Sequence, residues 1–159
     1  MRNASIGLFI VGGLLLLAAT APQARAASRE SFTATITFGP LGTPEKFWID
    51  DQGVAHYRGV PSTGTITGDI VGTVSSLSNA NFDAAGNGDT SSFFTISPAS
   101  GGTWTGHANS TLVAGVASGK LVAQGSGALD GTKIMGSTMF LLFVDEPEIV
   151  QGIILSPHG

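Results

Sequence analysis

The chain has 159 residues, no cysteine, a formal net charge of −4 and only 11% charged residues. The absence of cysteine excludes disulfides, thiol nucleophiles, thiolate metal sites and a lipid-modified N-terminal cysteine. Seven basic residues against eleven acidic ones leave no basic patch for a phosphate backbone, so we expect no nucleic-acid partner. With 42% apolar residues, the composition is typical of a folded protein.

Residues 1–26 have the three parts of a secretory signal peptide. Arg2 gives the positive start, residues 6–19 form an apolar run, and residues 24–26 (ARA) are a small-residue cleavage site. An apolar run of this length rises only ~21 Å as a helix, short of the ~30 Å hydrocarbon core, which disfavours a permanent anchor. The sequence predicts a helical signal cleaved after Ala26, a secreted or periplasmic location, and no membrane association afterwards.

Cleavage leaves residues 27–159 as one domain. Because the signal holds Arg2 and Arg25, five basic residues remain against eleven acidic ones, which gives the mature chain a net charge near −6. A chain of this length can bury a substantial core. Without disulfides, its stability must come from packing and from a hydrogen-bonded sheet.

The predicted elements begin with residues 31–38 (SFTATITF), where strict alternation of apolar and polar side chains indicates a half-buried strand. A turn with two prolines and two glycines follows at residues 39–44. Strands at 46–49 and 54–60 then flank a turn in which Gly53 supplies a positive φ. Further strands are predicted at residues 63–70, 71–82, 90–97, 102–108, 113–116, 120–126, 133–144 and 149–155.

These elements predict an all-β fold. No eleven-residue window after the signal keeps the 3.6-residue apolar period of a helix. Glycines recur inside or beside strands, as at Gly64, Gly68 and Gly72, and they permit the bulges and bends that barrel closure requires. We predict a single antiparallel β-barrel of about eight strands.

Three segments resemble a group of exported bacterial β-barrels. They are residues 48–59 (WIDDQGVAHYRG), residues 64–69 (GTITGD) with Gly72-Thr73, and residues 119–131 (GKLVAQGSGALDG). Through them the chain is similar to uncharacterised families related in fold to the allene oxide cyclase-like and dirigent barrels, which are calycin-like. The resemblance implies an eight-stranded barrel whose cavity holds a hydrophobic intermediate and steers its cyclisation or coupling without a cofactor. It carries no functional residue over, because the shared motifs are glycine and turn spacings.

Six polar or aromatic residues are candidates for ligand binding: Trp48, His56, Tyr57, Arg58, Asp69 and Trp104. His56 and Arg58 fall on one face of their strand and Tyr57 on the other. An imidazole or phenol facing a barrel interior could bind a polar group or act as an acid or base. The alternative is a polar outer face opposite an inward Tyr57, which is the commoner arrangement. Likewise, the aromatic residues either line a pocket or belong to the core, and the core is the commoner place.

The sequence predicts no metal site and no cofactor. His56, His107 and Asp69 could meet in space, but short ligand signatures such as His-x-x-x-His are absent. Residues 125–127 (GSG) lack the spacing of a nucleophile elbow. We therefore assign no catalytic residue.

The late part of the chain is apolar on both strand faces. Residues 139–144 (MFLLFV) are entirely apolar and residues 149–155 nearly so. Between them, Asp145, Glu146 and Glu148 predict a solvated connection or, alternatively, the closure of a barrel mouth. Since a barrel strand buries only its inner face, something must cover the outer side of this run. Either the C-terminal strand or another subunit covers it, and the second case predicts a homo-oligomer through residues 139–155.

Three functions remain open at this point. The first is an exported barrel that binds a small apolar ligand, or serves a surface role, without catalysis. The second is a cofactor-free isomerase or cyclase of the allene oxide cyclase type, with His56, Tyr57, Arg58 or Asp69 as polar groups in its cavity. The third is an extracellular structural or adhesive protein with a filled barrel. An open or filled interior separates the first two from the third.

Overall fold

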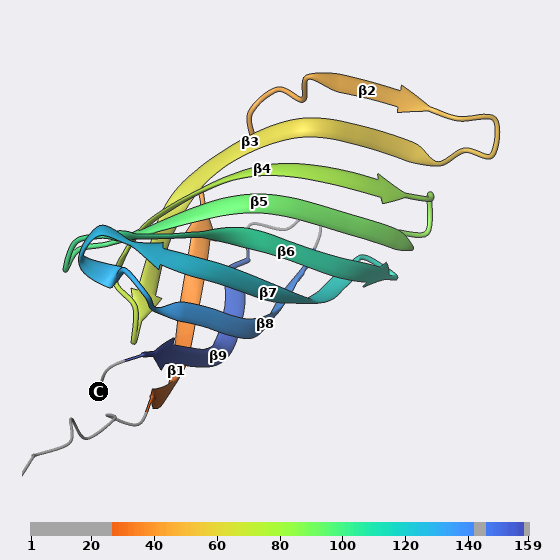
Figure 1. Cartoon of the computed structure of the whole chain (residues 1–159). Helices are drawn as coiled ribbons and strands as arrows, with labels where there is room; N and C mark the ends of the chain where they lie inside the picture. The colour runs from red at the N-terminus through yellow and green to blue at the C-terminus, as the bar shows by residue number, and fades with distance from the viewer. Residues whose placement is uncertain (1–26, 142–145, 158–159) are drawn as a thin grey trace, which may run out of the picture.

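The structure is a computed structural model that describes residues 27–141 and 146–157. The predicted signal peptide and residues 142–145 of the apolar run lie outside the described residues. The described residues form nine strands. Figure 1 shows them curling around one axis. The elements are β1 (Ser28–Phe38), β2 (Lys46–Ile49), β3 (Ala55–Gly68), β4 (Gly72–Phe82), β5 (Gly88–Pro98), β6 (Thr103–Val113), β7 (Val116–Ser126), the 3-10 helix η1 (Gly127–Leu129), β8 (Lys133–Leu141) and β9 (Glu148–Ser156).

The all-β prediction is confirmed, and eight of the strands form a closed antiparallel barrel. From β3 to β9 each strand pairs with the next in the chain, and β1 closes the ring by pairing with both β9 and β3. The remaining strand, β2, pairs only with the first part of β3 and lies outside the ring, at the upper edge of Figure 1. No helix in the described part of the chain has the length and apolarity needed to span a bilayer.

Strand β3 changes its partner along its length. Its first residues, Ala55 to Arg58, pair with β2, and residues 64–68 pair with β1. The sequence predicted two strands here, residues 54–60 and 63–70, whereas β3 continues through Pro61 as one strand. Pro61 is tolerated because its nitrogen and its carbonyl point to the same side of β3, and neither β1 nor β2 pairs with that side at this residue. The Pro61 carbonyl instead accepts a 2.8 Å hydrogen bond from the Gly42 N–H.

A hydrophobic core fills one end of the barrel. Along β1 the inward residues Phe32, Ala34 and Ile36 are buried between exposed or half-buried polar residues. They pack with Ile70 of the β3–β4 turn and with inward residues of the other strands: Ile66, Val74, Phe94, Ile96, Trp104, Leu121, Ala123, Ile134 and Val150. The indole N–H of Trp104 is satisfied at this end, since it donates a 2.8 Å bond to Oγ1 of Thr132.

The hairpin between β6 and β7 differs from the prediction. A strand was predicted over residues 113–116, whereas Ala114 and Gly115 form its two-residue turn, with φ of 50° and 79°. The strands on either side are longer than predicted, since β6 continues to Val113, with Ser110 buried on its inner face, and β7 begins at Val116. This polar inner surface belongs to the other end of the barrel.

Candidate functional site: a cavity in the barrel

A cavity of about 580 Å³ occupies the end of the barrel opposite the core. Inward side chains line it where β4, β6 and β8 end and where β3, β5 and β9 begin. Its apolar wall includes Phe38, Tyr57, Val60, Ala80, Phe82, Phe94, Ala108, Phe140 and Val150. Cavities of this size commonly hold small molecules in proteins.

A row of serine hydroxyls crosses one wall of the cavity. The Oγ atoms of Ser62 on β3 and Ser76 on β4 lie 2.7 Å apart, and those of Ser78 on β4 and Ser92 on β5 lie 2.8 Å apart. The Oγ atoms of Ser76 and Ser78, at 3.4 Å, connect the two pairs. The alternation of β4 and β5 places all four side chains on the inner face. Each hydroxyl can donate and accept, so the row offers polar groups to a ligand without carrying charge.

A carboxyl group stands on the opposite wall. Glu148 opens β9, and the Thr138 hydroxyl on β8 donates a hydrogen bond to its Oε1. In the ring of eight strands, β9 is four strands away from β5 and therefore lies across the barrel from Ser92, the β5 end of the serine row. Burial raises the pKa of Glu148, and the Thr138 bond only partly offsets that rise. Of the two predictions for Glu148, the solvated connection is wrong, since β9 begins earlier and turns this side chain into the cavity.

The segment between β1 and β2 forms part of the cavity mouth. Pro40, Leu41 and Pro44 line the cavity. Their backbone is fixed to β3 by hydrogen bonds from Gly39 to Thr63, at 2.9 Å, and from Gly42 to Pro61, at 2.8 Å. An apolar ligand would therefore meet this segment on entry.

A series of aromatic side chains extends from the cavity mouth to β2. Tyr57 stacks on Phe82 with ring centroids 5.3 Å apart, and Phe47 of β2 lies 4.7 Å from Tyr57 on its other side. Of the six predicted site residues, Tyr57 is the one that lines the cavity. Its place follows from the alternation of β3, which points Tyr57 inward and His56 outward.

Three other predicted residues form a cluster on the outer face of the barrel. The rings of Trp48 and His56 stack with centroids 4.7 Å apart, and the Arg58 guanidinium lies 5.1 Å from the Trp48 ring. His56 also contacts Asp50 and Asn81. This Trp48 cluster fixes β2 to β3 and β4, and it lies outside the cavity.

The last two predicted residues, Trp104 and Asp69, lie neither in the cavity nor in the Trp48 cluster. Trp104 belongs to the core at the filled end. Asp69 is exposed in the β3–β4 turn, where its carboxylate accepts the backbone N–H of Thr33 at 2.8 Å. The residues that sequence reasoning missed are the serine row, Thr138 and Glu148. Alternating serines at 76 and 78, in phase with Val74 and Ala80, were the available signal for an inward polar wall.

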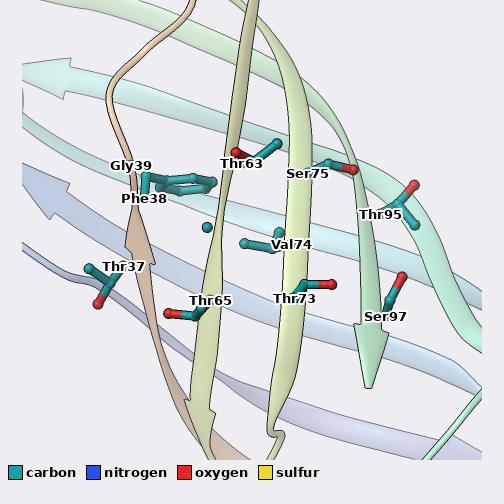
Figure 2. Close-up of a pocket in the computed structure, with 11 residues that line it drawn as sticks. Thr37, Phe38, Gly39, Thr63, Thr65, Thr73, Val74, Ser75, Thr95 and Ser97 are labelled. Atoms are coloured by element: carbon teal, nitrogen blue, oxygen red, sulfur yellow. The ribbon is translucent and has the colours of Figure 1, made fainter. Parts of the chain in front are cut away.

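A second hollow, of about 570 Å³, lies on the outside of the barrel over β1, β3, β4 and β5. Figure 2 shows the hydroxyl groups of its threonines and serines standing around Phe38 and Val74, which belong to the inner face. Gly64 also lines it, at a place where β1 and β3 approach so closely that a side chain would collide with the Thr37 carbonyl. This groove is open to solvent, whereas the barrel cavity encloses a ligand more fully, so the cavity is the candidate site.

The described residues contain no group of three histidine, aspartate or glutamate side chains placed to hold a metal ion. In particular, His107 on β6 contacts Phe93 and is separate from His56 and Asp69. No protein-family model matches the chain, and a search of curated proteins gives no significant match. Function must therefore be argued from the cavity itself.

Proposed function

We propose that this chain is an exported β-barrel that binds a small, largely apolar ligand in its cavity and carries out no chemistry on it. The observation that carries the proposal is the open interior of about 580 Å³ with its aromatic and aliphatic wall. Burial of such a ligand gains about 25 cal/mol per Å² of apolar surface, and the serine row can orient one polar group. A filled interior would have argued against this function.

The rival function is a cofactor-free isomerase or cyclase of the allene oxide cyclase type. The closed eight-stranded ring agrees with the resemblance to that group, and we propose the relationship on the motifs given above. Catalysis would require acid and base groups that converge on one ligand atom. Glu148 and Tyr57 line the cavity from different walls, and His56, Arg58 and Asp69 lie outside it. Binding is therefore the better supported function.

Displacement of a fluorescent probe tests the binding function. The neutral dye N-phenyl-1-naphthylamine should become brighter with the purified mature protein, and mass spectrometry under native conditions should detect any ligand carried through purification. Ser76→Phe, which fills the cavity, should abolish the dye signal. Ser75→Phe is the matched control, because Ser75 is the outward neighbour on β4. Equal dye binding by both variants would exclude the cavity as the site.

We also propose export to the periplasm or the exterior by the signal in residues 1–26. The strand β1 begins at Ser28 and pairs from there with Ser156, so cleavage after Ala26 leaves every described pairing of β1 intact. Mass spectrometry of the protein from an exporting host should give a mature chain that starts at Ala27. Retention of residues 1–26 in the exported fraction would contradict the cleavage.

A further inference from the structure

The charged side chains among the described residues of the cavity wall are all acidic. Among the described lining residues, the charged side chains are Glu146 and Glu148, and lysine, arginine and histidine are absent. The nearest guanidinium, that of Arg58, is held outside by the carbonyls of Tyr57 and Ala80, at 2.7 and 3.2 Å, and by Asn81. An anionic ligand would thus enter a low-dielectric space with no cation to pair with, which is costly.

Glu148 is the charged group placed deepest in this wall. Ile36 of β1 lies opposite it in the sheet, and its Oε1 accepts the Thr138 hydroxyl. Its Oε2 has no hydrogen-bond partner within the described ranges, and the side chain lines the cavity. A carboxylate in such a place is stabilised by a cation that brings its own N–H donors.

We infer that the cavity selects a small organic cation, a protonated amine on an apolar body, whose ammonium group pairs with the Glu148 carboxylate. This inference rests on the proposed binding function. The apolar body would lie among Phe38, Phe82 and Phe140, and aromatic faces also attract cations. A polar group at the far end of the ligand would reach the serine row across the barrel.

The proton balance follows from the state of Glu148. When Glu148 is protonated and the amine enters as its ammonium form, the carboxyl proton leaves to solvent as the ion pair forms. Acidification then opposes binding, because protons compete with the ammonium group for the carboxylate. The other titratable groups facing the cavity are Glu146 at the mouth and the Tyr57 phenol. Burial raises the pKa of Glu148, so this competition begins at a higher pH than for an ordinary glutamate.

A matched set of ten-carbon probes tests the inference at neutral pH. Decylamine, decanol and decanoate share one apolar chain and differ in the charge of the head group, and each is used to displace N-phenyl-1-naphthylamine. Decylamine should displace the dye at about tenfold lower concentration than decanol, the equivalent of ~1.4 kcal/mol. Decanoate should be the weakest competitor, and decylamine should weaken as the pH falls.

Glu148→Gln should remove the advantage of decylamine over decanol, measured as the ratio of the concentrations at which the two displace the dye from the same variant. Glu146→Gln is the control at the exposed mouth and should keep most of the advantage. If the dye and all three probes fail to bind the wild-type protein, the binding function itself is wrong. If the three probes bind equally, if decanoate binds best, or if Glu148→Gln keeps the preference, the binding function stands and the cation inference is overturned. The probe ranking on wild-type protein decides this even if the variant does not fold.

Discussion

Nε2 of His56 lies 2.9 Å from Oδ2 of Asp50. The other ring nitrogen, Nδ1, lies 2.8 Å from Oδ1 of Asn81. The orientation of the Asn81 amide is fixed, because Oδ1 accepts from Arg58 at 2.7 Å and Nδ2 donates to Asp89 at 3.0 Å. Both ring nitrogens of His56 therefore face acceptors, and both bonds form only when the imidazole carries two protons.

This arrangement predicts a pH-dependent contribution of His56 to stability. The hydrogen bond to Asp50, with a second to Asn81, raises the pKa of His56 above its ordinary 6.5. The contribution is therefore complete below pH 6.5 and is lost as the pH rises through the raised value in the folded state. The His56 bond also lowers the pKa of Asp50 below 3.8, so the contribution of Asp50 is present above that pH and lost on strong acidification.

Urea unfolding between pH 5.5 and 8.5 measures the His56 effect. The stability difference between wild type and His56→Gln should shrink as the pH rises, and NMR should place the His56 midpoint above 6.5. His107→Gln, at an exposed histidine of β6, should keep the wild-type pH dependence. A constant difference between wild type and His56→Gln over this range would refute the double-donor state.

The bond between Trp104 and Thr132 predicts a cost for losing one hydroxyl at the filled end. Thr132→Val keeps the side-chain shape but leaves the buried indole N–H without its acceptor. We expect a loss of ~1–3 kcal/mol in the free energy of unfolding. Thr132→Ser keeps the oxygen and should lose less than the valine variant. Chemical unfolding of both variants provides the measurement, and equal losses would mean that the bond contributes nothing.

Close approach of β6 and β7 predicts that Gly106 tolerates no side chain. A Cβ atom there would overlap the Val122 carbonyl and lie 2.6 Å from the Cα of Ala123. Gly106→Ala should destabilise the barrel by ~1–3 kcal/mol through overpacking. Gly39→Ala is the control, since its Cβ would have an ordinary 3.5 Å contact with the Thr63 carbonyl. Similar melting temperatures for the two variants would show that the strands can separate at Gly106 without cost.

The outer faces of β8 and β9 lead us to expect self-association. Met139 and Ile149 lie opposite each other in the sheet with 52% and 42% of their surfaces exposed, and Leu141 beside them is 41% exposed. Light scattering at micromolar concentration should give an oligomer, and Met139→Glu should shift it towards the monomer. Thr65→Glu, an outward position on β3, should leave the oligomer intact. A monomeric wild-type protein would rule out this expectation.

The alternation of side chains made the barrel predictable from sequence. In β1 each apolar residue between polar ones indicated the inner face, and the glycines between strands indicated a closed sheet rather than a flat one. Where the inner face is itself polar, inward and outward residues no longer differ in polarity, so alternation does not reveal the strand. The inward face was therefore missed at Ser76 and Ser78, and the strand that holds Ser110 was predicted too short. The polar wall of the cavity lies in these places.

The Trp48 cluster shows the limit of reasoning from residue type. Trp48, His56 and Arg58 were candidates because such side chains often bind ligands, yet here they bind one another across two strands. Which strand lies beside which is a property of the whole ring and not of any local segment. Glu148 was missed for the same reason, because its hydrogen-bond partner Thr138 lies on the neighbouring strand.

The first strand of the barrel is completed by the last. Residues Ser28 to Ile36 of β1 pair with Glu148 to Ser156 of β9, while every pairing from β3 to β9 joins neighbours in the chain. A chain that emerges N-terminus first, from the ribosome or in the proposed export, can therefore form the hairpins from β3 to β9 in order, whereas β1 lacks one of its two neighbouring strands until β9 arrives. During this interval the open edge of β1 is where a chaperone would act.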